Sequence, residues 1–423
     1  NPNNYTKFAP PGDPSNLATI TNLARGDVDQ AMADADVVVE MSFDCAHVHQ
    51  GYIEPHACVV DYGDGKANVW CSSQGHFRVR SMTADVLGVD NSKVKVVPAE
   101  IGGGFGGKTT VYLEPIAAKL SEKSGKPVKL LMTREEVLRG SGPAPSAELR
   151  IKIGATNDGE LTAIDGWMAY GVGAFSDMAG LIGAMSVASY KFPNLRMETY
   201  TALTNTPKSA AYRAPSAPHA AWAIESVVDE IATELGMDPI DLRLKNAAVE
   251  GDLTAMGMPH PRVGLVECLE ALKASDHYQS EPAEGTSRGM AVGFWFNIGE
   301  ESSATVNLNE DGTANVITGS PDIGGSRASM ALMAAETLGI DVYSITPIVA
   351  DTESVGFTDV TEGSRATFAT GKAVVEACED LIEQLKARAA TIMGVDVGEV
   401  AWVDGAAVSP GHGGGEGGDP LTL

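Results

Sequence analysis

Two stretches of the chain resemble each other, and this internal repeat limits the folds that the chain can adopt. The first contains Asp64-Gly65-Lys66-Ala67-Asn68-Val69 and then Leu87-Gly88-Val89-Asp90; the second contains Asp311-Gly312-Thr313-Ala314-Asn315-Val316 and then Leu338-Gly339-Ile340-Asp341. The two pairs occur in the same order at nearly the same separation. Each pattern predicts a hairpin, a helix and a further strand. We therefore expect two copies of one hairpin–loop–helix–strand unit, with a ligand site where the copies meet.

Hydrophobic periodicity places further elements on both sides of a polar linker. Strands are predicted at residues 37–41, 57–61, 67–71, 94–97, 128–132, 147–154, 161–168, 289–296, 304–308, 314–318 and 345–350. Helices are predicted at residues 27–35, 77–87, 113–122, 218–235, 240–246 and 329–338. The polar stretch at residues 276–288 is typical of a linker. The expected fold is α+β, with two related domains of mixed sheets and helices at residues 1–283 and 284–423, the second incomplete.

Composition narrows the class of protein. The 423 residues carry a formal net charge of −26, whereas a nucleic-acid-binding protein usually presents a basic face. The five cysteines form no CxxC pair, which argues against a zinc ribbon or an iron–sulfur cluster held by this chain. Reduced thiols, and no apolar run long enough to span a membrane, predict a cytoplasmic protein.

A glycine-rich segment between a predicted strand and a predicted helix is the strongest candidate for ligand binding. Gly102-Gly103-Gly104-Phe105-Gly106-Gly107-Lys108-Thr109 fits the GxxxxGK[ST] pattern, so a phosphate-binding loop of a nucleotide hydrolase is one interpretation. Pro115 argues against it, because that helix would begin near Lys108 and hold proline in its interior. The many glycines instead favour backbone amides packed against a bulky ligand, beside Phe105. A tight turn without a ligand is the third interpretation.

The segment from Gly102 to Lys108 resembles a signature of the xanthine dehydrogenase and aldehyde oxidase family, the molybdenum hydroxylases. Other segments match this family's motifs in the family's order, from about Gly26 to Leu423. Each motif alone is weak, but the ordered set is specific. The other matching segments are Tyr52-Ile53-Glu54-Pro55-His56-Ala57, Ser72-Ser73-Gln74, Lys126-Pro127-Val128-Lys129, Thr133-Arg134-Glu135-Glu136, Thr204-Asn205-Thr206-Pro207, Ala211-Tyr212-Arg213-Ala214-Pro215, Asp238-Pro239-Ile240-Asp241-Leu242-Arg243 and Gly363-Ser364-Arg365-Ala366-Thr367.

The resemblance implies that the chain is part of the molybdopterin-binding large subunit of such an enzyme. Family members hydroxylate aldehydes or N-heterocycles at carbon, using water. Their cofactor is molybdenum held by molybdopterin, with the cytosine dinucleotide form as one option, and a glutamate acts as general base. Electrons leave through iron–sulfur clusters to FAD. The expected partners are a small-molecule substrate, an iron–sulfur subunit and an FAD subunit.

The resemblance also assigns residues to the cofactor. Gln74 matches the glutamine that hydrogen-bonds an oxo ligand of molybdenum, and Arg213 matches an arginine on the cofactor side. No side chain is assigned as a metal ligand. The predicted cofactor-binding residues are Gln74, Gly104, Phe105, Gly106, Arg213, Gly324, Gly325, Ser364, Ala366 and Thr367.

Several positions depart from the family's pattern, and three of them concern the predicted site residues. Thr109 stands where xanthine-oxidising members carry a substrate-binding glutamate, which argues against purine oxidation. Pro215 replaces an aromatic residue that often stacks on flat substrates. Gly325 replaces a common cofactor-side glutamine, although its loop is still expected to bind pyrophosphate through backbone amides. Thr109 and Pro215 are therefore the predicted substrate-side residues.

The family's catalytic glutamate has no match in this chain. Glu416 lies in a glycine-rich run too early in the family's order, and Glu54 occupies a structural position in its motif. We therefore expect the base, and the family's N-terminal substrate-side domain, to come from elsewhere, with a second molybdopterin-binding chain as one source. An inactive scaffold of the same fold is the remaining alternative, which bound molybdenum would exclude.

Overall fold

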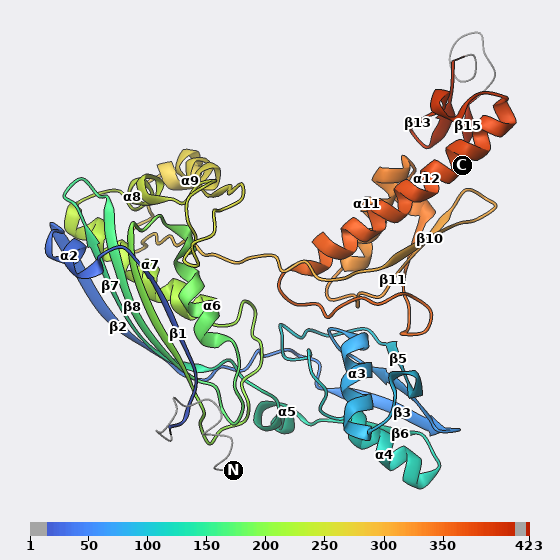
Figure 1. Ribbon diagram of the computed structural model, residues 1–423, viewed down its shortest axis with the longest axis horizontal. Coiled ribbons are helices and arrows are strands. Elements are labelled where there is room, and N and C mark those ends of the chain that lie inside the picture. The colour runs from blue at the N-terminus through green and yellow to red at the C-terminus, as the bar shows by residue number, and fades with distance from the viewer. Residues whose placement is uncertain (1–14, 411–419) are drawn as a thin grey trace. The chain divides into compact units, whose positions relative to one another are not determined.

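The computed structural model describes residues 15–410 and 420–423. The chain forms two compact units, and each combines two separate stretches of sequence (Figure 1). The first unit comprises Asn1–Gln50 and Leu138–Trp295, and the second comprises Gly51–Val137 and Phe296–Leu423. Glu416 lies outside the described residues. The domain boundary expected between residues 283 and 284 stays a prediction.

The first unit is built on a five-stranded sheet in the order β1-β9-β8-β7-β2. Strands β8 and β9 run parallel, and the other neighbours are antiparallel. Alternate residues of β7, such as Leu149 and Ile151, are fully buried in the core that α7 also lines. The elements are β1 (Leu17–Arg25), α2 (Val28–Ala33), β2 (Val37–Cys45), β7 (Ser146–Ala155), β8 (Leu161–Gly171), α6 (Ala179–Met185), η2 (Ser186–Ser189), β9 (Asn194–Ala202), α7 (Ala217–Leu235), α8 (Pro239–Asn246), α9 (Leu265–Ala274) and α10 (Asp276–Gln279).

A buried ion pair between α7 and α8 fastens the segment that leaves this unit. Arg243, 0% exposed, donates from Nε to Glu225 at 2.9 Å. The same carboxylate oxygen accepts the backbone N–H of Val292 at 2.8 Å. The strand predicted at residues 289–296 is therefore wrong: the segment is irregular, and its backbone bonds to side chains instead of a neighbouring strand.

The second unit contains the predicted repeat, which the structure confirms. Each copy is an antiparallel hairpin followed by a helix and a third strand parallel to the hairpin's second strand. Ala67 pairs with Val94 in the first copy, and Ala314 pairs with Ile345 in the second. The first copy has β3 (Ala57–Gly63), β4 (Lys66–Cys71), α3 (His76–Leu87) and β5 (Val94–Pro98); the second has β10 (Ala304–Leu308), β11 (Ala314–Thr318), α11 (Ser326–Leu338) and β12 (Ile345–Val349).

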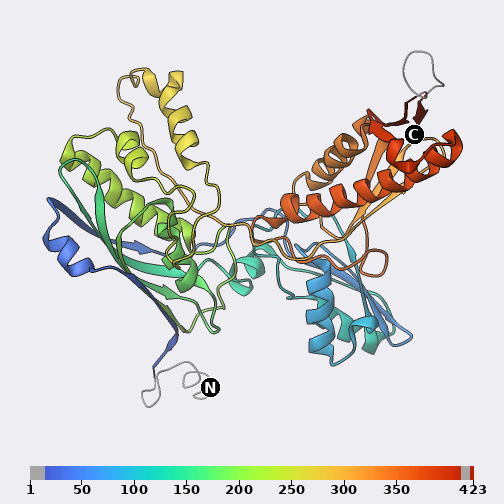
Figure 2. The same cartoon turned by 45° about the horizontal axis from the view of Figure 1, so that its top comes forward.

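Both copies continue through a long loop into a second helix. In the first copy this helix is α4 (Glu114–Ser124), with Pro115 in its first turn, where a helix needs no backbone N–H. In the second copy it is α12 (Gly371–Met393), preceded by the π-helical turn η4 (Ala366–Thr370). Helices α11 and α12 lie side by side against the β10-β11-β12 sheet (Figure 2). We refer to residues 57–124 as the first repeat and to residues 304–393 as the second repeat.

Smaller elements complete the second unit. Strand β6 extends the first repeat's sheet beside β3, and a separate three-stranded sheet follows α12. Helix α5 lies where the chain returns to the first unit. No helix in the described ranges combines the length and apolar character needed to cross a bilayer. These elements are β6 (Val128–Leu131), α5 (Arg134–Gly140), η1 (Asn91–Lys93), η3 (Val342–Ser344), η5 (Val397–Glu399), β13 (Ala401–Val403), β14 (Ala406–Val408) and β15 (Leu421–Thr422).

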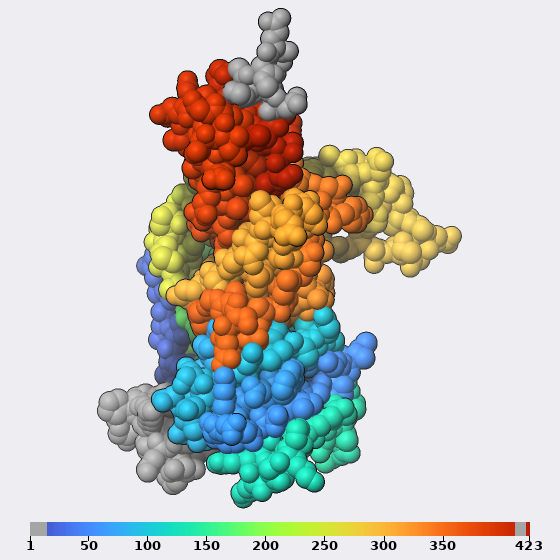
Figure 3. All heavy atoms as spheres, turned by 90° about the vertical axis from the view of Figure 1, so that its right-hand side faces the viewer, coloured from blue at the N-terminus to red at the C-terminus, as the bar shows by residue number. Residues whose placement is uncertain are grey.

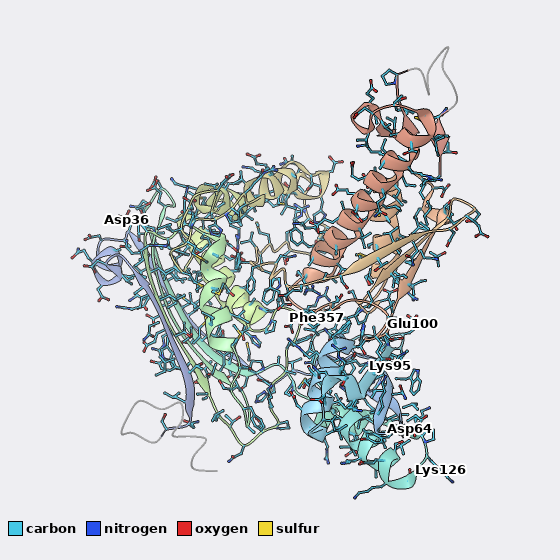
Figure 4. All side chains as sticks on the ribbon, turned by 45° about the vertical axis from the view of Figure 1, so that its right-hand side comes forward. Asp36, Asp64, Lys95, Glu100, Lys126 and Phe357 are labelled. Atoms are coloured by element: carbon cyan, nitrogen blue, oxygen red, sulfur yellow. The ribbon has the colours of Figure 1, made fainter. Side chains whose placement is uncertain are left out.

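The two repeats contact each other directly. Thr352 donates its backbone N–H to the carbonyl of Val96, and its hydroxyl accepts the N–H of Val96, each at 3.1 Å. The ring of Phe357 meets that of Phe77 edge-on, with centroids 5.4 Å apart. The blue and orange surfaces of the two repeats adjoin in Figure 3. Figure 4 labels Phe357 and Glu100 along this junction.

Candidate functional site

Most of the predicted cofactor-binding residues lie in four loops of the second unit. These loops join a strand to the following helix, twice in each repeat, so the repeat itself brings them to corresponding positions. Gln74 lies between β4 and α3; Gly104, Phe105, Gly106 and Thr109 lie between β5 and α4; Gly324 and Gly325 lie between β11 and α11; Ser364, Ala366 and Thr367 lie between β12 and α12.

The side chain of Gln74 ties three of these segments together. It is 4% exposed, and its Oε1 accepts the backbone N–H groups of Gly106 at 2.8 Å and Lys108 at 3.2 Å. Its Nε2 donates to the carbonyl of Thr361 at 2.8 Å. The main chain of Gln74 also bonds to Lys108 and Thr361. Nε2 carries two hydrogens, and Thr361 accepts one of them.

The glycine-rich loop leaves backbone donors available. Hydrogen bonds use the N–H groups of Gly106 and Gly107, whereas those of Gly103, Gly104 and Phe105 have no acceptor among the described residues. Gly103 and Gly106 have φ of 92° and 103°, and Phe105 has φ of 53°. Left-handed residues in such a turn can direct neighbouring N–H groups toward one side, as in an anion-binding nest. Strain in a residue such as Phe105, whose side chain is 42% exposed, is typical of functional loops.

Close packing explains one glycine of this loop. A Cβ on Gly104 would lie 2.5 Å from Oε1 of Gln74, closer than atoms can approach. Because Gly104 has no side chain, it leaves the space that the carboxamide of Gln74 occupies. Thr109, the predicted substrate-side residue, donates its hydroxyl to the carbonyl of Gly106 at 3.0 Å and so closes the same turn.

Lys108 does not behave as the lysine of a phosphate-binding loop. Its side chain is 1% exposed, and Nζ lies 2.6 Å from Oε2 of Glu54. Burial lowers the pKa of Lys108, and Glu54 opposes that change. Helix α4 begins at Glu114 instead of at the lysine. Nothing in the described part of the chain therefore supports the nucleotide-hydrolase interpretation.

The second repeat offers a pocket of about 200 Å³ beside its two loops. Gly324, Gly325 and Thr361 line it, together with Ala366 and Thr367. The hydroxyl of Thr361 is buried and has no hydrogen-bond partner among the described residues. Such an orphaned hydroxyl beside a cavity is suited to a polar ligand.

The start of α11 is already capped by the chain's own carboxylate. Oδ1 of Asp322 accepts the backbone N–H groups of Gly325 and Ser326, each at 2.8 Å. Oδ2 of Asp322 accepts Nε of Arg327 at 2.7 Å. The predicted pyrophosphate contact of Gly325 would therefore depend on its missing side chain rather than on its N–H group.

A buried arginine organises the loop that carries Ser364. Arg365 is 0% exposed and donates to the carbonyls of Gly299, Asp359 and Glu301 and to the hydroxyl of Ser302. Ser364 itself is exposed, with φ of 59°. The neighbouring arginine therefore fixes the loop while Ser364 stays accessible.

Arg213 and Pro215 belong to the first unit. Their loop, which leads into α7, holds three left-handed residues that are not glycine: Arg213, Ala214 and Ser216, with φ of 29°, 62° and 61°. Arg213 is exposed. The side-chain Nε2 of Gln50 holds the loop through the carbonyl of Ala211, at 2.8 Å. Strain of this kind agrees with a functional loop, and the roles of Arg213 and Pro215 stay predictions.

Sequence reasoning did not recognise three residues that organise the candidate site: Lys108, Thr361 and Arg365. Lys108 was assigned only through a motif, Thr361 acts through its main chain, and Arg365 was only part of a matching segment. The position of Lys108 seven residues from Pro115 showed that it was not at a helix start, but nothing in the sequence paired it with Glu54.

A polar, anionic cofactor fits the loops that the structure brings together. The first repeat provides a buried carboxamide and three backbone donors that have no acceptor within the described ranges. The second provides a pocket with an orphaned hydroxyl. Molybdopterin is such a ligand, because it combines a phosphate with a ring that has many hydrogen-bonding groups.

Comparison with known proteins agrees with this fit. Family models described as molybdopterin cofactor-binding domain match residues 9–247 and 267–417. The xanthine dehydrogenase molybdenum-binding subunit of Escherichia coli O157:H7 is 30% identical over 91% of this chain and 54% of its own length. The nicotinate dehydrogenase large molybdopterin subunit of Eubacterium barkeri is 34% identical over 60% of this chain and 62% of its own length.

A solved structure gives the same result. Aldehyde oxidoreductase from Desulfovibrio gigas superposes with a TM-score of 0.80 at 28% identity, over 88% of this chain and 43% of that protein. The chain thus spans about half the length of these relatives. The expected α+β fold with two such domains is confirmed. The chain belongs to the molybdopterin cofactor-binding family that includes the xanthine dehydrogenases and aldehyde oxidoreductases.

Proposed function

We propose that this chain is the molybdopterin-binding part of an enzyme that hydroxylates an aldehyde or an N-heterocycle at carbon, using water. The observation that carries the proposal is the buried carboxamide of Gln74, held between the glycine-rich loop and Thr361. A carboxamide fixed by three bonds keeps one N–H direction constant, as orientation of a bound group requires. Thr109, in place of an acidic residue, favours an aldehyde or simple heterocycle over a purine.

The chain's own residues would bind and orient the cofactor, which when bound supplies the redox and oxygen-transfer chemistry. Gln74 would donate its remaining N–H to an oxygen ligand of the cofactor. Gly104, Phe105 and Gly106 would present the backbone beside it, with Phe105 excluding water. Gly324, Gly325, Ser364, Ala366 and Thr367 would hold the pterin or its phosphate, and Arg213 would neutralise charge on the cofactor side.

Further components follow from the same proposal. An iron–sulfur chain and an FAD chain would carry the electrons away. The general base would be a carboxylate outside these residues, and a second molybdopterin-binding chain is one source of it. Pro215 would leave more room over a flat substrate than an aromatic ring does. Cytoplasmic localisation and the cytosine dinucleotide form of the cofactor belong to this proposal as well.

Molybdenum content tests the proposal first. The protein, purified with whatever copurifies from molybdate-replete cells, should contain about one molybdenum per chain by elemental analysis, together with a releasable pterin. A preparation without either would support an inactive scaffold.

Gln74→Ala should then lower turnover about a hundredfold while the complex still assembles, as loss of one oriented polar contact does. Unchanged turnover would remove Gln74 from the cofactor site.

A further inference from the structure

A single carboxylate oxygen closes the glycine-rich loop at both ends. Oε2 of Glu54 accepts the backbone N–H of Gly102 at 2.7 Å and Nζ of Lys108 at 2.6 Å. These two residues are the first and last of the GGGFGGK segment. The backbone N–H of Glu54 also donates to the carbonyl of Gly102 at 3.2 Å. Glu54 therefore holds the loop in a closed turn from outside the loop itself.

The lysine end of this closure is buried. Lys108 is 1% exposed, and its Nζ lies 5.1 Å from the centroid of the Tyr52 ring. The hydroxyl of Tyr52 in turn hydrogen-bonds His56 at 2.8 Å. A buried ammonium group without its carboxylate would be left with an aromatic face as its main attraction. The pairing with Glu54 is thus a condition for burying Lys108.

The same lysine is joined to Gln74 through its main chain. The backbone N–H of Lys108 donates to Oε1 of Gln74 at 3.2 Å, and its carbonyl accepts the backbone N–H of Gln74 at 2.9 Å. Any shift of Lys108 therefore moves both the side chain and the backbone of Gln74. A continuous set of bonds runs from Glu54 through Lys108 to the carboxamide.

We propose that Glu54 is a positioning residue that acts through Lys108 on Gln74. The inference rests on the proposed function for its effect on catalysis, but the positioning itself concerns only this chain. Glu54 touches neither cofactor nor substrate in this role. Its charge, rather than only its hydrogen-bonding capacity, is required, because it balances a buried ammonium group.

Hydrogen–deuterium exchange of the complete chain, without cofactor, tests the positioning directly. Glu54→Gln keeps an acceptor for Gly102 but removes the charge that Lys108 needs. The peptide containing residues 102–110 should exchange about tenfold faster, because an unpaired buried charge weakens local structure. Glu122→Gln is the matched control, since Glu122 forms an exposed pair with Lys119 and should leave that peptide unchanged. Unchanged exchange in Glu54→Gln would overturn the proposal.

A double-mutant cycle then tests the route through Gln74. In the holoenzyme, Glu54→Gln should lower kcat about tenfold with KM little changed, and Gln74→Ala should lower it further. Combined, the two substitutions should be no worse than Gln74→Ala alone, because they act on one unit. Multiplied effects would overturn the proposal, since they would show that Glu54 acts independently of Gln74.

A further variant and the wild-type protein distinguish failure of the positioning proposal from failure of the proposed function. If Glu54→Gln does not fold, Glu54→Asp retains the charge but is too short to reach both partners, and the same cycle applies to it. A wild-type protein without molybdenum would overturn the proposed function only, because the exchange result does not depend on the cofactor. An intact loop in both Glu54 variants would overturn the positioning proposal alone.

Discussion

The two repeats share one backbone plan, yet each holds its long loop with a different buried cation. In the first repeat, Lys108 is 1% exposed and is held by the carboxylate of Glu54. In the second, Arg365 is 0% exposed, and neutral oxygens take its hydrogen bonds, while the nearest carboxylate, Glu300, lies 3.5 Å away. A left-handed residue that is not glycine precedes each cation: Ser364 lies directly before Arg365, and two glycines separate Phe105 from Lys108.

The difference follows from the shapes of the two cations. An ammonium group is a compact charge that one carboxylate can satisfy, whereas a guanidinium group is a planar fork with five donors. Arg365 can therefore gather several carbonyls from two segments, and Lys108 can close one turn on one residue. The first repeat thus balances its cation with one carboxylate, whereas the second adds several hydrogen bonds from neutral oxygens to its ion pair with Glu300.

The largest expected effect comes from Arg365→Ala. The substitution leaves three carbonyls and a hydroxyl without their donor, so we expect the free energy of unfolding to fall by about 4 kcal/mol. Arg365→Lys should recover only part of this loss, because it lacks the fork. Calorimetric melting of each variant measures the effect. Lys372→Ala is an exposed control: it removes a surface helix pair, so stability should change by only about a few tenths of a kcal/mol. A loss below about 1 kcal/mol for Arg365→Ala would show that Arg365 does not organise its loop.

As the pH falls, the first repeat should lose stability at a higher pH than the second repeat. His76 begins α3 and is 0% exposed, whereas Ser326 begins α11 and does not titrate. Burial lowers the pKa of His76 to about 4, although Asp351 opposes the change and Arg80 adds to it. The folded state thus binds fewer protons than the unfolded state between about pH 6.5 and pH 4, so stability falls as pH falls through that window. A shift of this size corresponds to about 3 kcal/mol at its full extent.

Hydrogen exchange at pH 7 and pH 4.5 separates the two repeats. We expect α3 to lose protection relative to α11 at the lower pH, after correction for the intrinsic pH dependence of exchange. His76→Gln should remove most of this difference, and His277→Gln, at an exposed position, should not. Equal loss of protection in both helices would contradict the assignment of acid sensitivity to the first repeat.

Sequence reasoning succeeded where structure is determined locally. The turns after Asp64 and Asp311 and the helix ends at Gly88 and Gly339 are set by residues that adopt positive φ, so the repeat could be predicted. It failed where distant segments decide. Strands β1 and β9 pair over a separation of more than 150 residues, roughly the length of a whole domain, and were not predicted. Helix α12, which begins at Gly371, was not predicted either.

The candidate site shows the same limit. The resemblance identified Gln74 and the glycine-rich loop, and the structure does bring them into contact. The carbonyl of Thr361 could not be predicted, because any residue type supplies a carbonyl. The pairing of Lys108 with Glu54 joins residues 54 positions apart, and burial of a lysine leaves no mark in the local sequence. Main-chain contacts and the partners of buried charges can therefore be identified only from the tertiary structure.

Two glycines, one in a strand-to-helix loop of each repeat, should respond differently to alanine. A Cβ on Gly104 would meet Gln74, whereas Gly325 has open space but φ of 106°. Gly104→Ala should cost about 2 kcal/mol by overpacking and should also reduce bound molybdenum, because it displaces Gln74. Gly325→Ala should cost about 1 kcal/mol through backbone strain alone. Melting temperature and molybdenum per chain measure both variants, and a greater molybdenum loss in Gly325→Ala would reverse the comparison.

The smallest effect concerns the exposed ion pair between the two repeats. Arg327 donates to both carboxylate oxygens of Glu100, at 2.8 and 3.0 Å, but Glu100 is 76% exposed. Glu100→Gln should therefore change the free energy of unfolding by less than about 1 kcal/mol. Added salt should remove even that difference, because it screens exposed charges. Thermal melting of Glu100→Gln and wild type in low and high salt measures this. A larger loss that persists in high salt would mean that the junction depends on this pair, instead of on the two buried bonds between Val96 and Thr352.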